Sequence, residues 1–229
     1  MNVTTCIFDA YGTLFDVNAA AREVAARPGF ERLDKAWPQI AADWRAKQLQ
    51  YTWHRAVTGD HIAFWQVTQD GLDWALEAAG LADDAEMRAA LLALYWELPA
   101  FPEVPAMLAA LKAAGRATGI LSNGSPDMLA GAVTSAGVGE VLDAVLSVED
   151  VGIYKPARVV YDMVGRHFGC TPAQVLFVSS NGWDAAAATA YGFNTVWVNR
   201  ARQPVDRLPE APQHRLDDLT GIPDLAGRL

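Results

Sequence analysis

The sequence predicts an α/β fold in which a Rossmann-like parallel sheet forms the core and a helical domain is inserted into it. Between about residues 115 and 199, short apolar runs alternate with helical stretches, which is typical of a parallel sheet flanked by helices. An earlier apolar run, VTTCIF at residues 3–8, is separated from them by a long stretch without a convincing strand. We therefore expect a core of residues 1–16 and 99–229, interrupted by a helical cap domain at residues 17–98.

The core elements follow one another in a regular order. The spacing of Val104, Leu108 and Leu111 predicts a helix, and Gly115 follows as a left-handed C-terminal cap. The next elements are strand ATGIL (117–121), helix Pro126–Ala136, strand DAVLSV (143–148), helix Arg158–Phe168, strand VLFVSS (175–180), a helix at 183–191 and strand TVWVN (195–199). An irregular surface segment is expected around Pro204, Pro209 and Pro212, before a last short helix.

The inserted stretch is rich in Ala, Leu, Glu and Arg, which favours helices. Six tryptophans are distributed along it, and we expect them to pack in the core and at interfaces rather than to form a ligand cage. They are Trp37, Trp44, Trp53, Trp65, Trp74 and Trp96.

Composition narrows the class of protein. With 229 residues, 52% of them hydrophobic, the chain can bury a substantial core. The formal net charge is −9 and no Lys/Arg cluster alternates with aromatic residues, so no nucleic-acid partner is expected. Cys6 and Cys170 are too few and too far apart for a disulfide framework or a zinc site, and the four histidines show no metal-ligand spacing. The expectation is a soluble cytoplasmic protein with no leader segment, no membrane association and no cofactor.

Polar residues follow four of the predicted strands. Ligands of open parallel sheets bind outside the carboxyl ends of the strands, so these residues are candidates for a site. They are Asp9, Tyr11, Gly12 and Thr13 after the first strand, then Ser122, Asn123 and Gly124, then Lys155, and finally Ser179, Ser180, Asn181 and Asp184. Any one of them would be an ordinary turn or capping residue by itself, but four such loops together predict a functional site.

Two of these loops carry further signals. The run Ser125, Pro126, Asp127 predicts a helix start with a capping hydroxyl, and its free N–H groups would favour an anion near Ser122 and Asn123. If Lys155 points at Asp9, its charge would keep that carboxylate ionised at neutral pH, as a nucleophile requires.

The motifs FDAYGTLFD, LSNG, YKP and SSNGWD occur in this order, with a helical insertion after the first. This arrangement resembles the haloacid dehalogenase superfamily, and specifically its L-2-haloacid dehalogenase branch. The resemblance covers nearly the whole chain, including WRAKQLQYTW (44–53) in the insertion.

The branch is indicated by two absences. Phosphatases of this superfamily have a second aspartate two residues after the nucleophile and paired acids in the last motif, which hold magnesium. Here Tyr11 occupies the position of that second aspartate, and Asp184 has no adjacent acid. The set of oxygen ligands that magnesium prefers is therefore incomplete. An alkoxide leaving from a phosphate ester needs an acid and a metal, whereas a halide leaves as a stable anion without either.

The resemblance implies that Asp9 attacks C2 of an L-2-haloalkanoate, forms an ester and expels halide, after which water attacks the ester carbonyl and releases a D-2-hydroxy acid of inverted configuration. It implies that Lys155 with Tyr161 keeps Asp9 charged, and that Thr13 orients it. Asp184, Ser179 and Asn181 would act on the hydrolytic water. Arg45 and Asn123 would receive the halide, Ser122 would hold the substrate carboxylate, and Tyr11, Leu49, Phe64 and Trp183 would surround its alkyl group.

Two alternatives stay open at this point: a magnesium-dependent small-molecule phosphatase of the same superfamily, and a non-catalytic binding protein on the same fold. The family commonly forms homodimers through cap helices, so a homodimer is expected. His54 and Ala46 depart from the family pattern in the insertion, which leaves pocket size, chain length and preferred halogen open.

Overall fold

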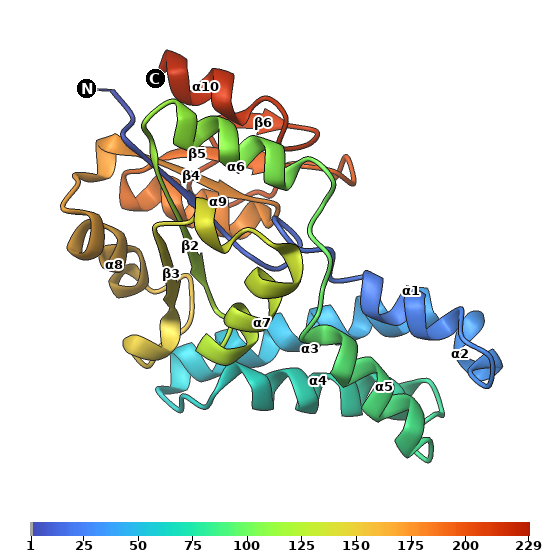
Figure 1. Cartoon of the computed structure of the whole chain (residues 1–229). Coiled ribbons are helices and arrows are strands. Elements are labelled where there is room, and N and C mark those ends of the chain that lie inside the picture. Colours follow the sequence, from blue (N-terminus) through green and yellow to red (C-terminus); the bar gives the residue numbers. More distant parts are fainter. Residues whose placement is uncertain (1) are drawn as a thin grey trace.

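A computed structural model describes residues 2–229, and it shows one parallel sheet flanked by helices (Figure 1). The sheet has six strands in the order β3-β2-β1-β4-β5-β6, and every paired neighbour is parallel. The strands are β1 (Thr5–Phe8), β2 (Ala117–Ser122), β3 (Ala144–Ser147), β4 (Val175–Ser179), β5 (Asn194–Val198) and β6 (His214–Leu216). The predicted α/β class with a parallel sheet is therefore confirmed.

Strand β1 lies inside the sheet and pairs with β2 on one side and β4 on the other. Its residues Cys6, Ile7 and Phe8 are fully buried, as expected for a parallel sheet covered on both faces. Five helices provide that cover, with α6 and α10 packed against each other, and α8 against α9. They are α6 (Val104–Ala113), α7 (Pro126–Ala136), α8 (Arg158–Phe168), α9 (Gly182–Tyr191) and α10 (Ile222–Arg228).

The segment between β1 and α6 forms a group of helices beside the carboxyl ends of the strands, at the bottom of Figure 1. We call residues 17–98 the helical insertion. Its helices are α1 (Ala19–Ala25), α2 (Glu31–Asp34), α3 (Trp37–Thr58), α4 (Phe64–Ala78) and α5 (Ala85–Tyr95). Helix α3 packs along α4, where the Trp44 indole N–H donates to the carbonyl of Thr68 at 2.7 Å and the Gln48 amide donates to the Thr68 hydroxyl at 2.9 Å. These buried contacts fix the two helices relative to each other.

Most predicted elements lie where the sequence placed them. Helices α7 and α8 begin and end at the predicted residues, and Gly115 has a φ of 71° after α6. Strand β6 was not expected, because three residues, two of them polar or charged, give no strand signal. The Pro-rich segment before it is irregular and exposed, as predicted.

One expectation needs correction. Ser125 is the N-cap residue of α7, but its side chain makes no capping hydrogen bond there and instead contacts Glu149 and the amide of Trp65. The tryptophans of the insertion differ in burial: Trp44 is buried, whereas Trp53 and Trp74 are each 39% exposed. Trp53 packs edge-on against Trp183, with ring centroids 5.5 Å apart.

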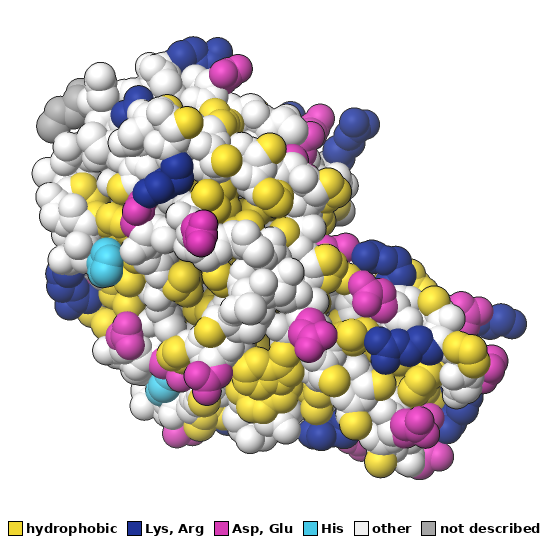
Figure 2. Space-filling model, in the orientation of Figure 1, with side chains coloured by type: hydrophobic (Ala, Val, Ile, Leu, Met, Phe, Trp, Pro, Cys, Tyr) yellow, Lys and Arg dark blue, Asp and Glu magenta, His cyan; other side chains and the backbone are white. Residues whose placement is uncertain are grey.

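The surface shows charge of both signs. Figure 2 shows acidic and basic side chains intermixed on the visible face, with hydrophobic side chains between them. Across residues 2–229, no helix combines the length and the apolar character that crossing a bilayer demands.

Candidate active site

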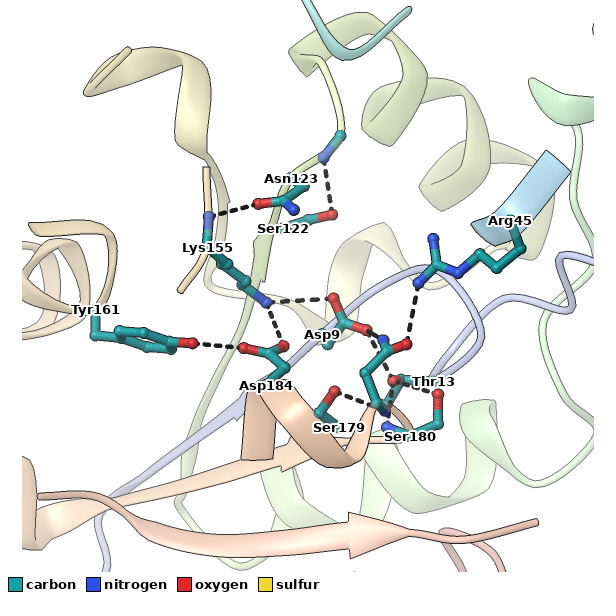
Figure 3. A network of polar contacts seen from close by, with 12 residues as sticks. Asp9, Thr13, Arg45, Ser122, Asn123, Lys155, Tyr161, Ser179, Ser180 and Asp184 are labelled. Carbon is teal, nitrogen blue, oxygen red and sulfur yellow. Dashed lines mark hydrogen bonds and ion pairs between the residues drawn. The ribbon is translucent and has the colours of Figure 1, made fainter. Parts of the chain in front are cut away.

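Four loops meet at the carboxyl edge of the sheet and bring the predicted polar residues together (Figure 3). Asp9 directly follows β1, Asn123 follows β2, and Asn181 follows β4 at the start of α9. Lys155 lies in the loop between β3 and α8. Because β1 is flanked by β2 and β4, residues far apart in the sequence converge on Asp9.

The Asp9 carboxylate is held by three side chains. The Thr13 hydroxyl donates to Oδ2 at 3.0 Å, the Asn181 amide donates to the same oxygen at 2.8 Å, and the Lys155 ammonium lies 3.2 Å from Oδ1. Asp9 is only 7% exposed. These three donors fix the orientation of the Asp9 carboxylate.

Lys155 also contacts Asp184, with Nζ 2.8 Å from Oδ2, and Tyr161 donates from its hydroxyl to Oδ1 of Asp184 at 2.7 Å. All three side chains are buried. Burial alone would lower the pKa of Lys155, but the charges of Asp184 and Asp9 outweigh it and raise that pKa above its ordinary value. Burial raises the pKa of Asp184, and the positive charge of Lys155 opposes the rise. A positive charge thus lies between two carboxylates.

The helical insertion adds a second cation to the site. Arg45 on α3 donates from Nη2 to Oδ1 of Asn181 at 3.1 Å, which places its guanidinium one residue away from Asp9 in the network (Figure 3). Leu49 lies about one turn further along α3, and Phe64 is the first residue of α4. The insertion therefore supplies both charge and apolar surface to the same place.

A small cavity lies over Asp9 between the sheet and the insertion. It is lined by Asp9, Tyr11, Arg45, Leu49, Phe64, Ser122, Asn123, Lys155, Asn181 and Trp183. All seven residues predicted to bind substrate or halide are in this set. Thr13, Tyr161, Ser179 and Asp184 do not line the cavity; they contact residues that do, or lie behind them.

The hydroxyl and amide side chains near the cavity also brace its loops. The Ser122 hydroxyl accepts from the amide of Gly124 at 3.1 Å, and the Asn123 side-chain oxygen accepts from the amide of Lys155 at 3.0 Å. The Ser179 hydroxyl accepts from the amide of Asn181 at 3.1 Å. These bonds tie the loops after β2, β3 and β4 to defined positions.

A wider cleft of about 1150 Å³ opens beside the cavity. It runs between the helical insertion and residues 197–207, and Tyr11, Arg45, Leu49, Asn181 and Trp183 line both spaces. The cleft and the small cavity therefore adjoin each other along these shared residues. Arg45 lies at the junction, so an anion moving along the cleft meets a positive charge beside Asp9.

Tyr11 forms an apolar wall. Its ring stacks on Phe64 with centroids 6.2 Å apart and on Tyr95 with centroids 5.6 Å apart. Burial raises the pKa of Tyr11 well above its ordinary value, so the phenol stays neutral. Within residues 2–229, neither the Tyr11 hydroxyl nor the Trp183 indole N–H has a hydrogen-bond partner, although both are buried. Both residues line the cavity and keep a donor that a ligand can use.

The sequence placed Ser180 among the candidate loop residues but assigned it no role. Its backbone amide donates to the Thr13 hydroxyl at 2.8 Å, so Ser180 supports a side chain that contacts Asp9. Sequence reasoning missed two other residues near the site. Tyr95 stacks on Tyr11, and Gln48 contacts Tyr95 at 3.2 Å, but nothing in a helical sequence distinguishes them from ordinary packing residues.

No group of three or more His, Cys, Asp or Glu side chains within residues 2–229 is arranged to hold a metal ion. The two carboxylates at the site, Asp9 and Asp184, share the ammonium group of Lys155 instead.

A Rossmann-like sheet with a buried aspartate at its carboxyl edge, covered by an inserted helical group, defines a class of α/β hydrolase. The model of the haloacid dehalogenase-like hydrolase family matches residues 3–192, and the chain belongs to this family of enzymes. The resemblance inferred from the motifs is confirmed.

Individual relatives agree in sequence and in structure. The chain is 41% identical to (S)-2-haloacid dehalogenase 1 of Pseudomonas sp. (strain CBS-3), over 99% of this chain and 98% of that protein. A crystal structure of an L-2-haloacid dehalogenase is 39% identical, with a TM-score of 0.90, and the match covers 99% of this chain and 100% of that one. The Xanthobacter autotrophicus L-2-haloacid dehalogenase with chloropropionic acid covalently bound is 36% identical, with a TM-score of 0.85 and 98% of each chain covered.

Proposed function

We propose that this enzyme hydrolyses short L-2-haloalkanoic acids to D-2-hydroxy acids through an ester on Asp9. The observation that carries the proposal is the Asp9 carboxylate at a cavity wall, held by Thr13, Asn181 and Lys155. The relative with chloropropionic acid covalently bound supports it, because a covalent adduct is what a nucleophilic carboxylate forms.

In the first step, an oxygen of Asp9 forms a bond to C2 of the substrate from the side opposite the halogen. The carbon–halogen bond breaks, and its electron pair leaves with the halide, so C2 inverts. Arg45 and Asn123 line the cavity and receive the halide, while Ser122 binds the substrate carboxylate. Leu49, Phe64, Tyr11 and Trp183 surround the alkyl group and exclude water from the reacting carbon.

In the second step, water adds to the carbonyl carbon of the Asp9 ester and the bond from that carbon to the alkoxide oxygen breaks. Asp184 accepts one proton of the water and gives it to the departing alkoxide oxygen, so the product leaves with a hydroxyl group at C2. The second proton of the water is released to solvent when Asp9 returns to its carboxylate form. The raised pKa of Asp184 makes it a stronger base than an exposed aspartate. The backbone amide of Asn181 donates to the Ser179 hydroxyl and its side-chain amide donates to Asp9, so Asn181 is placed to orient the water near Asp9.

Residues 17–98 act in this proposal as a cap domain that completes the pocket. Arg45, Leu49 and Phe64 support this, because all three come from the helical insertion and line the cavity over Asp9.

We also infer a homodimer formed through the insertion. Exposed hydrophobic side chains on the insertion support this inference: Val57 on α3 is 88% exposed, and Trp53 on α3 and Trp74 on α4 are each 39% exposed. Light scattering after gel filtration, with Val57→Glu as the comparison, tests the oligomeric state. The two free cysteines, Cys6 and Cys170, support a reducing cytoplasmic setting, which cell fractionation tests.

The function is tested by halide release from each enantiomer of 2-chloropropionate in the presence of a chelator. We expect release from the L-enantiomer alone, and none from Asp9→Asn. Asp127→Asn, an exposed acid at the start of α7, serves as the matched control and should keep full activity. Intact-mass measurement during turnover should show an ester on the wild type.

Other outcomes would select other functions. Phosphate release from small phosphate esters that requires magnesium would establish a phosphatase and overturn the proposal. Absence of halide release, phosphate release and any covalent adduct would indicate a non-catalytic binding protein.

A further inference from the structure

The first turn of α4 lacks a capping side chain of its own. Its N-cap residue is Ala63, which offers no hydrogen-bond acceptor in its side chain, so the amides of Phe64 and Trp65 need partners from elsewhere. Both amides find them outside the helical insertion. Phe64 donates to the Glu149 carboxylate at 3.0 Å, and Trp65 donates to the Ser125 hydroxyl at 3.1 Å.

Glu149 and Ser125 form a unit with these two amides, which we call the clasp. The Ser125 hydroxyl donates to the same Glu149 oxygen that accepts from Phe64. A carboxylate at the start of a helix also interacts favourably with the positive end of the helix dipole. This explains why the Ser125 hydroxyl does not cap α7: its donor is used on Glu149 and its acceptor on α4.

The clasp joins the insertion to the loops that carry catalytic side chains. Ser125 closely follows Asn123, and Glu149 lies in the loop between β3 and α8, which also carries Lys155. Figure 1 shows this loop beside the beginning of α4. A third bond supports the same junction, because the Tyr154 hydroxyl donates to the carbonyl of Ile62 at 2.5 Å.

Phe64 transmits the effect of the clasp to the cavity. Its amide is held by Glu149, while its side chain, 2% exposed, lines the cavity and lies between Tyr11, 6.2 Å away, and Tyr154, 6.3 Å away. The open cleft lies on the opposite side, along Arg45 and Asn181, and Phe64 does not line it. One wall of the pocket is thus pinned while the other opens to solvent.

The geometry points to Glu149 and Ser125 as positioning residues that fix the first turn of α4 and so determine how much room the alkyl group of the substrate has beside Phe64. Neither touches the reacting atoms. The inference rests on the proposed function for its substrate class, and it assigns chain-length selectivity to a contact between the insertion and the sheet domain. Loosening the clasp lets Phe64 recede, which admits larger alkyl groups and binds small ones less tightly.

The clasp itself is tested by amide hydrogen exchange, which does not depend on activity. In the wild type, the Phe64 and Trp65 amides should be protected, unlike the first-turn amides of a frayed helix. Glu149→Ala should accelerate their exchange roughly 10- to 100-fold, as expected for losing a hydrogen bond to a charged acceptor. Glu149→Gln keeps an acceptor oxygen and should restore most of the protection. Asp150→Ala, the exposed neighbour, is the control.

Selectivity is tested with L-2-bromopropionate and L-2-bromobutyrate. In Glu149→Ala we expect the ratio of kcat/KM for the longer over the shorter acid to rise several-fold, with the change mainly in KM. Glu149→Gln and Asp150→Ala should keep the wild-type ratio. In a Phe64→Leu background, the effect of Glu149→Ala on the ratio should largely disappear, because the two residues act on one wall.

Each result decides a different point. Unchanged exchange in Glu149→Ala would overturn the clasp. Faster exchange with an unchanged ratio, or a uniform fall in kcat that Glu149→Gln does not rescue, would overturn the positioning role. A wild type that releases no halide would refute the proposed function together with its selectivity, while exchange would still decide whether the clasp holds α4.

Discussion

The Nζ atom of Lys155 lies 2.8 Å from Oδ2 of Asp184, and neither side chain is more than 1% exposed. A buried ion pair of this kind depends on both partners, because removing one leaves an uncompensated charge in a medium of low polarity. Asp9 lies on the other side of the same ammonium group, so Lys155 balances two carboxylates at once.

Lys155→Met should destabilise the protein and abolish turnover. We expect a loss of about 3–5 kcal/mol in the free energy of unfolding near neutral pH, since Asp184 and Asp9 lose their common cation. Denaturant unfolding followed by circular dichroism measures it. Lys112→Met, which breaks an ion pair with Asp143 in which both side chains are about one-third exposed, should cost no more than about 1 kcal/mol.

The loss of stability in Lys155→Met should depend on pH. Burial holds the pKa of Asp184 above its ordinary value of 3.8, and removing Lys155 takes away the charge that opposes this rise. In the folded variant Asp184 therefore binds a proton that it does not bind in the unfolded chain. The loss in free energy of unfolding relative to the wild type should be smallest at acidic pH and should grow as the pH rises. In the wild type, the raised pKa of Lys155 keeps its contribution intact until the pH exceeds the ordinary value of 10.5. A deficit independent of pH would contradict this explanation.

Asp184→Asn should separate the two chemical steps. The amide preserves the shape and the contact with Tyr161 but cannot accept a proton from water, so ester hydrolysis should slow by roughly 10²- to 10⁴-fold while the first halide is still released. Rapid quenching should show one halide per active site, with the ester visible by intact mass. In the wild type, kcat should fall as the pH drops through the raised pKa of Asp184. Equal slowing of both steps would argue against this role.

Gly124→Ala should disturb the wall formed by Tyr11. A Cβ atom at Gly124 would lie 2.6 Å from Cε2 of Tyr11, and that ring cannot withdraw freely because Phe64 and Tyr95 stack on it. We expect a loss of about 1–3 kcal/mol in stability and a higher KM for the haloacid. Gly227→Ala in α10, where a Cβ meets nothing within 4 Å, should leave both quantities unchanged. A Gly124→Ala variant with wild-type KM and stability would show that the ring moves easily.

The two thiols should differ in reactivity. Cys6 is fully buried in β1, and burial raises its pKa to about 12, whereas Cys170 is partly exposed. At pH 8, a thiol reagent should therefore titrate one thiol in the native protein and two in denaturant. Cys170→Ser should leave no reactive thiol in the native state. Rapid labelling of Cys6 in that variant would mean that β1 opens far more readily than the packing suggests.

The sheet and its helices could be predicted because their signals are local. Helix α7 carries Pro126 at its first position and Gly137 directly after its last residue, and strand β4 is a continuous apolar run. The convergence of the polar loops on Asp9 was predictable for a related reason, since loops at one edge of a parallel sheet must meet. Strand β6 escaped because three residues show no periodicity, and its place depends on pairing with β5.

The contacts that Tyr95, Glu149 and Ser125 make between the insertion and the sheet domain could not be predicted. Tyr95 has the sequence context of any buried helix residue, yet it stacks on Tyr11 from a distant part of the chain. Glu149 resembles an exposed acid in a short loop, and only the three-dimensional arrangement brings it to the amide of Phe64. Ser125 carried a correct local signal for a helix start, but a partner in space used its hydroxyl differently.

The placement of β1 between β2 and β4 has a consequence for biosynthesis. Strand β1 is synthesised before both of its partners and can pair with them only when residues 117–120 and 175–178 have been made. Until then its apolar side chains have no neighbour in the sheet, while the intervening helices can already form from local contacts. The apolar side chains of β1 therefore stay without strand partners until β2 and β4 have been synthesised. Chaperones should bind the nascent chain most strongly during that interval.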